Sequence, residues 1–286
     1  MDKKVIITAA LAGSATFKHQ NQSVPYTPAE FAEEAHKVYK AGAAMVHVHA
    51  RDEAQQGMAT ANVEKVRVVY DAIKQKTPEL IVQITSSVGL AYEDRMAPII
   101  ALKPEMSSLN TNSMNFSVID RKTGEIYFDN VFTNTFTMLR DFGKKMEELG
   151  VKPEAEVYDV GGLDCWKLIN KQGIFKPPYC FNFVCGVAGG MKFRPEVFAS
   201  LVYNLPPGSN FNACGVGIEQ FPAITQSCLM GGHMRVGLED NTRLPNGELA
   251  KGSYEQVEWA ARIARCLGRE PATPAEARKI LGLKSP

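Results

Sequence analysis

The run VIITAALA at residues 5–12 is short, apolar and rich in β-branched residues, which is typical of a buried strand. Gly13 and Ser14 close this run, and TPAE at residues 27–30 then supplies a threonine cap with proline at the first helical position. The order predicts a strand followed by a helix that ends near Gly42. Because similar pairs recur along the chain, we expect βα units around a parallel sheet.

Seven further strands are predicted at residues 45–49, 80–85, 106–110, 155–160, 180–185, 210–214 and 234–238. Helices are predicted at residues 28–42, 62–76, 92–102, 134–149, 163–171, 195–203, 219–230 and 253–267. Eight strands alternating with eight helices predict an α/β fold, a TIM (β/α)8 barrel. We expect one domain over residues 1–286, with a short C-terminal helix that ends at Gly282. A doubly wound open sheet fits less well, because Gly13 is isolated and no glycine fingerprint follows the first strand.

The stretch from Asn112 to Thr133 is long for a barrel connection and contains a predicted turn at residues 121–124. We expect it to form an excursion over the active-site face.

Composition excludes several classes of protein. Of the 286 residues, 45% are hydrophobic and 22% are charged, which is a globular balance. The formal charge of +1 gives no basic excess for binding nucleic acid. The six cysteines form no CxxC pair, which favours a reducing, cytoplasmic setting. No segment approaches the ~20 apolar residues of a membrane span, and we interpret the apolar N-terminal run as a strand rather than a signal peptide.

The segment HVHARD at residues 47–52 is the first candidate for chemistry. Alternation along a strand places His47 and His49 on one face, at the strand end where barrel active sites are built. Imidazole nitrogens are good ligands for zinc and similar metals. The alternative is two histidines that are hydrogen-bonded in a polar barrel interior without metal.

The segment RVGLED at residues 235–240 supplies the third candidate ligand. Arg235, Gly237 and Glu239 share one face, with Gly237 leaving room between the two side chains. Two histidines and Glu239 would leave coordination positions open, as catalytic zinc sites do. An Arg–Glu ion pair that plugs the barrel end is the alternative. Asp240 would lie above the site, within reach of Arg235 as an acid–base or orienting group.

Three other places carry weaker signals. The hydroxyls of Thr85, Ser86 and Ser87 can hold a carboxylate or carbonyl, or merely cap the next helix. Glu154 and Glu156 alternate on one predicted strand, so both can face inward as a base or ligand. The glycine-rich loop at residues 186–190 can admit phosphate to its amides but lacks the Gly-Lys-Ser/Thr ending.

Four segments together resemble the beta-keto acid cleavage enzymes: TPAE, HVHARD, RVGLED and the closing ATPAEAR at residues 272–278. The resemblance covers essentially the whole chain. It implies a (β/α)8 barrel, assembled as a homotetramer, with zinc held by His47, His49 and Glu239. It also implies that a beta-keto acid and acetyl-CoA are converted to acetoacetate and a new acyl-CoA.

The resemblance further implies roles for individual residues. Arg235 and Asp240 match a working pair that removes a proton from the substrate, and Glu156 matches a further site carboxylate. Ser86, or a neighbour among Thr85 and Ser87, would hold the substrate carboxylate.

One departure from the family concerns the substrate. The founding member acts on an amino-keto acid and has a carboxylate at the end of the first strand, where this chain has AGSAT at residues 12–16. An unpaired buried ammonium is costly, so we expect a neutral or anionic substrate side chain. Two other functions stay open: a metal-dependent aldolase or lyase that works without CoA, and a barrel that binds a ligand or metal without turnover.

Overall fold

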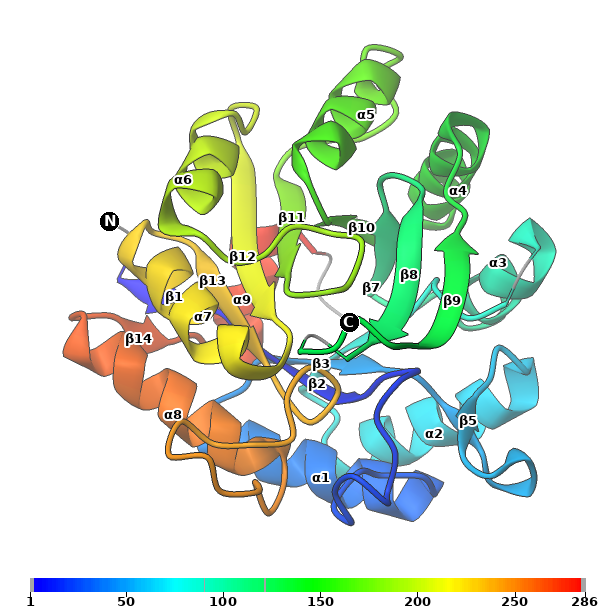
Figure 1. The fold of residues 1–286 in the computed structure, drawn as a ribbon. Helices are drawn as coiled ribbons and strands as arrows, with labels where there is room; N and C mark the ends of the chain where they lie inside the picture. Colours follow the sequence, from blue (N-terminus) through cyan, green and yellow to red (C-terminus); the bar gives the residue numbers. More distant parts are fainter. Residues whose placement is uncertain (1–2, 90, 121, 284–286) are drawn as a thin grey trace.

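The computed structural model describes residues 3–89, 91–120 and 122–283, and its centre is a closed barrel of eight parallel strands (Figure 1). In order around the barrel, the strands are β2 (Ile7–Ala12), β3 (Met45–Val48), β6 (Ile81–Ile84), β7 (Met106–Asn110), β10 (Lys152–Val157), β11 (Tyr179–Cys185), β12 (Ser209–Gly215) and β13 (His233–Val236). The pairing of Met234 with Ile7 closes the ring between the last and first strands. The predicted (β/α)8 barrel is confirmed.

Helices surround the barrel on its outside (Figure 1). They are α1 (Pro28–Ala41), α2 (Val63–Lys76), α3 (Tyr92–Leu102), α4 (Phe136–Leu149), α5 (Val160–Asn170), α6 (Pro195–Tyr203), α7 (Gln220–Leu229) and α8 (Ser253–Cys266). As predicted, Thr27 caps α1, and its side chain accepts from the backbone N–H of Glu30. Among the described residues, no helix has the length and apolar character needed to cross a membrane.

The remaining elements are short, apart from one hairpin. They are β1 (Lys4–Val5), β4 (Arg51–Asp52), β5 (Met58–Ala59), β14 (Glu270–Pro271), the 3-10 helices η1 (Glu53–Gln55) and η2 (Gly217–Glu219), and the C-terminal helix α9 (Pro274–Leu281). The last of these is the predicted terminal helix, and it ends before Gly282.

Several predicted boundaries were wrong: the strand predicted at residues 234–238 ends at Val236, and the helix predicted at residues 163–171 begins at Val160. The strand expected at residues 155–160 is β10, which begins at Lys152 and ends at Val157, and Val160 already belongs to α5. The reason is Asp159, whose side chain accepts from the backbone N–H of Gly162 at 2.8 Å and so starts the helix early.

The barrel interior is apolar at one end and polar at the other. Near the N-terminal ends of the strands, Met45, Ile81 and Met106 pack with Ala277 and Leu281 of α9. Toward the C-terminal ends, buried polar side chains replace them. Polar chemistry is therefore confined to the end of the barrel where the βα loops meet.

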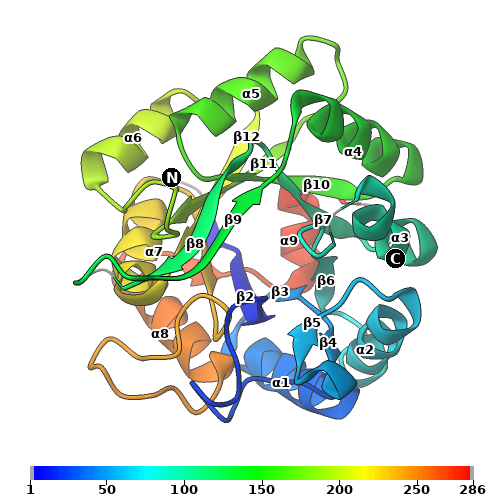
Figure 2. The same cartoon turned by 45° about the vertical axis from the view of Figure 1, so that its right-hand side comes forward.

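A hairpin of β8 (Met114–Ile119) and β9 (Ile126–Phe132) lies across this polar end, as the predicted excursion required (Figure 2). Ser117 of β8 pairs with Ala188 in the loop after β11. A Cβ added at Gly189, which has φ +94°, would lie 1.9 Å from the carbonyl oxygen of Asn115. This close approach explains why residue 189 is glycine. The same glycine-rich loop, residues 186–190, was considered above as a possible phosphate-binding loop.

The predicted turn at residues 121–124 falls within this hairpin. Arg121 lies outside the described residues, whereas Lys122 and Thr123 donate their backbone N–H groups to the side chain of Asp120. Gly124 follows with a positive φ of 78°.

Candidate active site

The end of β3 brings two imidazoles together inside the barrel. Nε2 of His47 and Nε2 of His49 lie 3.1 Å apart, and both side chains are buried. The other ring nitrogens are occupied: Nδ1 of His47 lies 2.6 Å from Oε1 of Gln83, and Nδ1 of His49 lies 3.1 Å from Oγ of Ser14. Both Nε2 atoms therefore face the interior together.

Glu239 reaches the same point from the segment after β13. Its Oε1 lies 3.7 Å from Nε2 of His47 and 3.5 Å from Nε2 of His49. Gly237 makes this possible, because a Cβ there would lie 2.1 Å from the carbonyl oxygen of Ala10, at φ +145°. The glycine thus serves a close backbone approach, rather than only leaving room between side chains as predicted.

Arg235 lies at the centre of a group of three carboxylates. Its Nε and Nη2 donate to the two oxygens of Asp240 at 2.9 and 3.0 Å, a bidentate contact. Its Nη1 donates to Glu156 at 3.2 Å, and Nη2 also donates to Glu239 at 2.6 Å. The predicted Arg–Glu ion pair is therefore present, beside the two histidines rather than instead of them.

The charges around Arg235 shift several pKa values. Burial raises the pKa of Glu156 to about 7, with Arg235 opposing the shift, and burial also raises the pKa of Asp240. Burial lowers the pKa of His47 to about 3, so this imidazole is neutral at pH 7. Burial opposes ionisation of Glu239, yet its histidine neighbours and Arg235 outweigh burial and lower its pKa.

The residues present fit a divalent cation. One ligand atom from each of His47, His49 and Glu239 lies within 4.8 Å of the others. Oε2 of Glu239 is buried without a hydrogen-bond partner in the described structure. Because imidazole nitrogens and carboxylate oxygens are common ligands of zinc and similar cations, a cation at this point would also give the orphaned oxygen of Glu239 a partner.

The hydroxyls predicted to bind substrate differ in availability. Oγ1 of Thr85 accepts from the backbone N–H of Ser87, and Oγ of Ser87 accepts from Asn110. Oγ of Ser86 is buried and has no hydrogen-bond partner in the described structure, although the Ser86 backbone N–H donates to Ser108. Thr85 and Ser87 keep an O–H that can donate to a ligand, whereas neither the donor nor the acceptor capacity of the Ser86 hydroxyl is used in the described structure.

Sequence reasoning missed three polar residues of the interior. Gln83 contacts His47, Asn212 contacts Glu154, and Tyr158 donates its hydroxyl to Asn110 at 3.1 Å. Their alternation with apolar neighbours along β6 and β12 and just after β10 indicates that these side chains face the interior. Alternation does not indicate which partner each side chain contacts.

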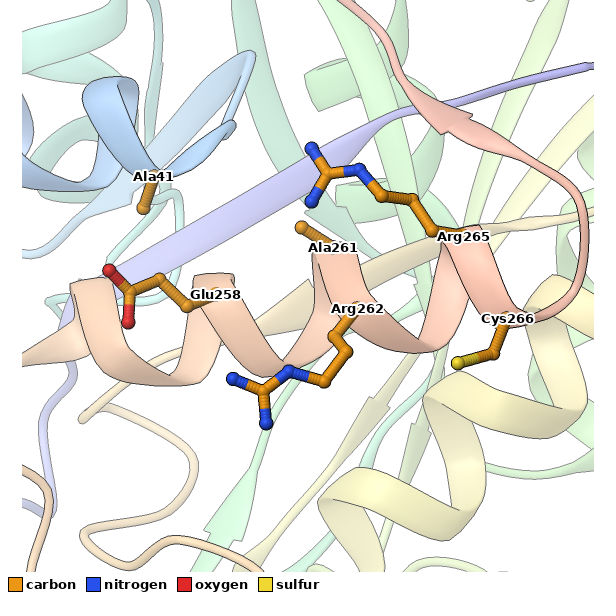
Figure 3. Close-up of a pocket in the computed structure, with 6 residues that line it drawn as sticks. All are labelled: Ala41, Glu258, Ala261, Arg262, Arg265 and Cys266. Carbon is orange, nitrogen blue, oxygen red and sulfur yellow. The ribbon is translucent and has the colours of Figure 1, made fainter.

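A separate surface groove of about 490 Å³ runs along α8 (Figure 3). It is lined by Ala41, Glu258, Ala261, Arg262, Arg265 and Cys266. Ala41 ends α1 and Cys266 ends α8, and barrel helices run opposite to the strands. The groove therefore lies at the barrel end opposite His47 and Glu239.

The barrel fold and its polar, acid-rich mouth define an enzyme of the (β/α)8 class. The chain belongs to the beta-keto acid cleavage enzyme family, whose model matches residues 4–283. It is an acyltransferase that cleaves a carbon–carbon bond.

Known proteins agree with this membership. The chain is 42% identical to a 3-keto-5-aminohexanoate cleavage enzyme of Fusobacterium nucleatum, over 99% of this chain and 100% of the relative. It is 30% identical to a 3-dehydrocarnitine:acetyl-CoA trimethylamine transferase of Rhizobium meliloti, over 99% and 98%. A solved structure titled as a ternary complex of ObcA with C4-CoA adduct and oxalate shares the fold, with TM-score 0.72 and 21% identity, over 91% of this chain and 68% of that chain.

Proposed function

We propose that the protein is a zinc-dependent enzyme that condenses a beta-keto acid with acetyl-CoA and releases acetoacetate and a new acyl-CoA. The observation that carries the proposal is the convergence of His47, His49 and Glu239 on one point, with the Arg235–Asp240 pair against it. Acetyl-CoA as the co-substrate is supported by the transferase relative.

His47, His49 and Glu239 would hold the zinc, leaving open coordination positions. When bound there, zinc would polarise the keto and carboxylate oxygens of the substrate and acidify the carbon between them. The buried Oγ of Ser86, which has no hydrogen-bond partner in the described structure, would bind the substrate carboxylate.

In this proposal a carboxylate oxygen of Asp240 removes the proton from the carbon between the keto and carboxylate groups of the substrate. Arg235 orients that carboxylate through both of its oxygens, and Glu156 accepts from Nη1 and so fixes the other side of the guanidinium. Burial favours the protonated carboxyl of Asp240, which makes its carboxylate a stronger base than a solvated aspartate.

The atoms balance in a Claisen and retro-Claisen exchange. The deprotonated carbon of the keto acid bonds to the acetyl carbonyl carbon, and CoA thiolate leaves. The thiolate then adds to the original keto carbon, and the bond between that carbon and the former nucleophile breaks. The acetyl group and the two-carbon carboxylate fragment leave together as the enolate of acetoacetate, which takes back the proton held by Asp240, while the original acyl group stays on CoA.

A neutral or anionic side chain on the keto acid is part of the proposal. The loop after β2, residues 13–16, contains no carboxylate and contacts the site through Ser14 and Thr16, whose hydroxyl donates to the backbone carbonyl of Glu239. An ammonium group beside this loop would lack a charged partner there.

We further propose a cytoplasmic homotetramer. The six cysteines are all free thiols, which suits a reducing compartment. Exposed apolar side chains on the β8–β9 hairpin suit burial between subunits, namely Val118, Ile119, Ile126, Tyr127, Phe128 and Val131. Light scattering on the purified protein measures the oligomeric state directly.

Mass spectrometry of CoA thioesters tests the reaction. The zinc-loaded protein is incubated with acetyl-CoA and a panel of neutral, anionic and cationic beta-keto acids. We expect a new acyl-CoA and acetoacetate in equal amounts, from a neutral or anionic acid. Loss of a keto acid without acetyl-CoA would instead indicate a lyase, and zinc binding without any turnover would indicate a binding protein.

A further inference from the structure

One interior residue, Gln83, connects the candidate metal site to Glu154, a carboxyl group that the proposed reaction does not use. Gln83 lies on β6 and Glu154 on β10, and their side chains are buried. Nε2 of Gln83 donates to Oε2 of Glu154 at 2.9 Å, and Oε1 of Gln83 lies 2.6 Å from Nδ1 of His47. Gln83 therefore bridges Glu154 and a candidate ligand.

The donors and acceptors of Glu154, Gln83 and His47 determine the direction of the hydrogen bonds that link them. In its carboxylate form Glu154 can only accept, and its two oxygens lie 2.8 Å from Nδ2 of Asn212 and 2.9 Å from Nε2 of Gln83. The amide of Gln83 must then present its NH₂ to Glu154 and its carbonyl oxygen to His47. An oxygen facing Nδ1 requires the hydrogen on Nδ1, so the lone pair of His47 lies on Nε2, toward Glu239.

We propose that Glu154 is a positioning residue that acts through Gln83 to hold His47 in the Nδ1–H tautomer. The inference rests on the proposed metal site and assigns Glu154 neither as a ligand nor as a base. Glu154 lies outside the group of converging ligand atoms, and its hydrogen bonds in the described structure go to two amides. Outer partners of metal-bound histidines typically orient the ring in this way.

The tautomer can be measured without metal or substrate. Histidine ¹⁵N spectra of the metal-free protein should show His47 with its proton on Nδ1. In Glu154→Ala the amide of Gln83 loses its acceptor and is free to rotate, so we expect signal from the Nε2–H form. Glu154→Gln should restore the wild-type spectrum, because its carbonyl still accepts from Gln83 and Asn212 can rotate its amide.

Zinc affinity gives a second readout. We expect Glu154→Ala and Gln83→Ala each to weaken binding about 10-fold, as outer-shell changes commonly do. Because Glu154 acts through Gln83, the double variant should bind no more weakly than Gln83→Ala alone. Asn182→Ala is the matched control, since both amide atoms of Asn182 are buried without hydrogen-bond partners in the described structure. It should leave the affinity unchanged.

Two results would overturn the inference: an unchanged His47 tautomer in Glu154→Ala, or an equal loss of affinity from Glu154→Ala with and without Gln83. If Glu154→Ala does not fold, Glu154→Leu replaces it, because leucine fills the buried space but cannot accept from Gln83, and it must shift the tautomer. If the wild type binds no zinc, the proposed function fails, whereas the tautomer spectra still decide the role of Glu154.

Discussion

Nη2 of Arg235 lies 2.6 Å from Oε1 of Glu239, and that same oxygen faces Nε2 of both His47 and His49. A single carboxylate therefore joins the candidate ligands to the candidate acid–base pair. Any change that moves Glu239 should affect metal binding and proton transfer together. A change at a histidine ligand should instead affect metal binding first, and a change at Asp240 should affect proton transfer first.

We expect the wild-type protein to bind one zinc ion and His47→Ala to bind it at least about 100-fold more weakly, because one of three protein ligands is lost. Chelation should abolish acyl-CoA formation by the wild type, and added zinc should restore it. Metal analysis after dialysis and titration of the metal-free protein measure these effects. His36→Ala is the control, since His36 contacts Thr77 outside the site. Equal zinc affinity of His47→Ala and His36→Ala would contradict the ligand assignment.

Asp240→Asn should lower kcat by about 10² to 10⁴-fold, because the base is lost while the side chain keeps its size. Zinc content should stay close to that of the wild type. Proton exchange at the carbon between the keto and carboxylate groups, followed by NMR in D₂O without acetyl-CoA, isolates this step. Exchange at the wild-type rate in Asp240→Asn would show that another group removes the proton.

Gly189→Ala should displace the β8–β9 hairpin, because the new Cβ would meet the carbonyl oxygen of Asn115 at 1.9 Å. We expect a loss of about 1–3 kcal/mol in the free energy of unfolding and a higher KM for substrate. Gly173→Ala is a matched control, since Gly173 has φ +69° but no atom within 4 Å of its added Cβ. Denaturant titration compares the two. Similar losses in both variants would mean that backbone strain alone, not the hairpin contact, requires Gly189.

Glu34 provides a test of pH-dependent stability away from the active site. It is buried on α1, and its Oε1 accepts from the backbone N–H of Tyr254 at 3.1 Å, at the start of α8. Burial raises the pKa of Glu34 above its ordinary value of 4.5. Protonation is thus favoured in the folded state, so its stabilising contribution is full below pH 4.5 and is lost as the pH rises through the raised pKa.

Glu34→Gln stays neutral and keeps a carbonyl acceptor for Tyr254. The free energy of unfolding of this variant, minus that of the wild type, should therefore increase as the pH rises from 4.5 and then level off. Denaturant titrations at several pH values measure the difference. Glu93→Gln, at an exposed position in the first turn of α3, should show a smaller change. A constant difference for Glu34→Gln would show that burial does not shift this carboxyl.

Local patterns predicted the elements of this barrel well, because strand and helix periods depend on neighbouring residues. The threonine cap at Thr27 and the alternation of His47 with His49 were both readable in this way. The early start of α5 was missed, since Val160 fits a strand as well as a helix. The capping contact from Asp159 to Gly162 decided between them.

The site was predictable only in part. The sequence indicated His47, His49 and Glu239 as candidate ligands of one metal, and the structure brings their ligand atoms together. It gave no reason to connect Gln83 with Glu154, which are 71 positions apart. Alternation indicates which side of a strand a residue faces, but not which residue it meets across the barrel.

The sequence by itself determined the order of strands and helices, the common face of His47 and His49 and the cap at Thr27, all of which follow from short-range geometry. Tertiary structure decided the closure of β13 on β2, the passage of the hairpin over Gly189 and the convergence on Arg235. These depend on contacts between distant segments, whose energies arise only when the barrel closes and brings the strands to a common interior.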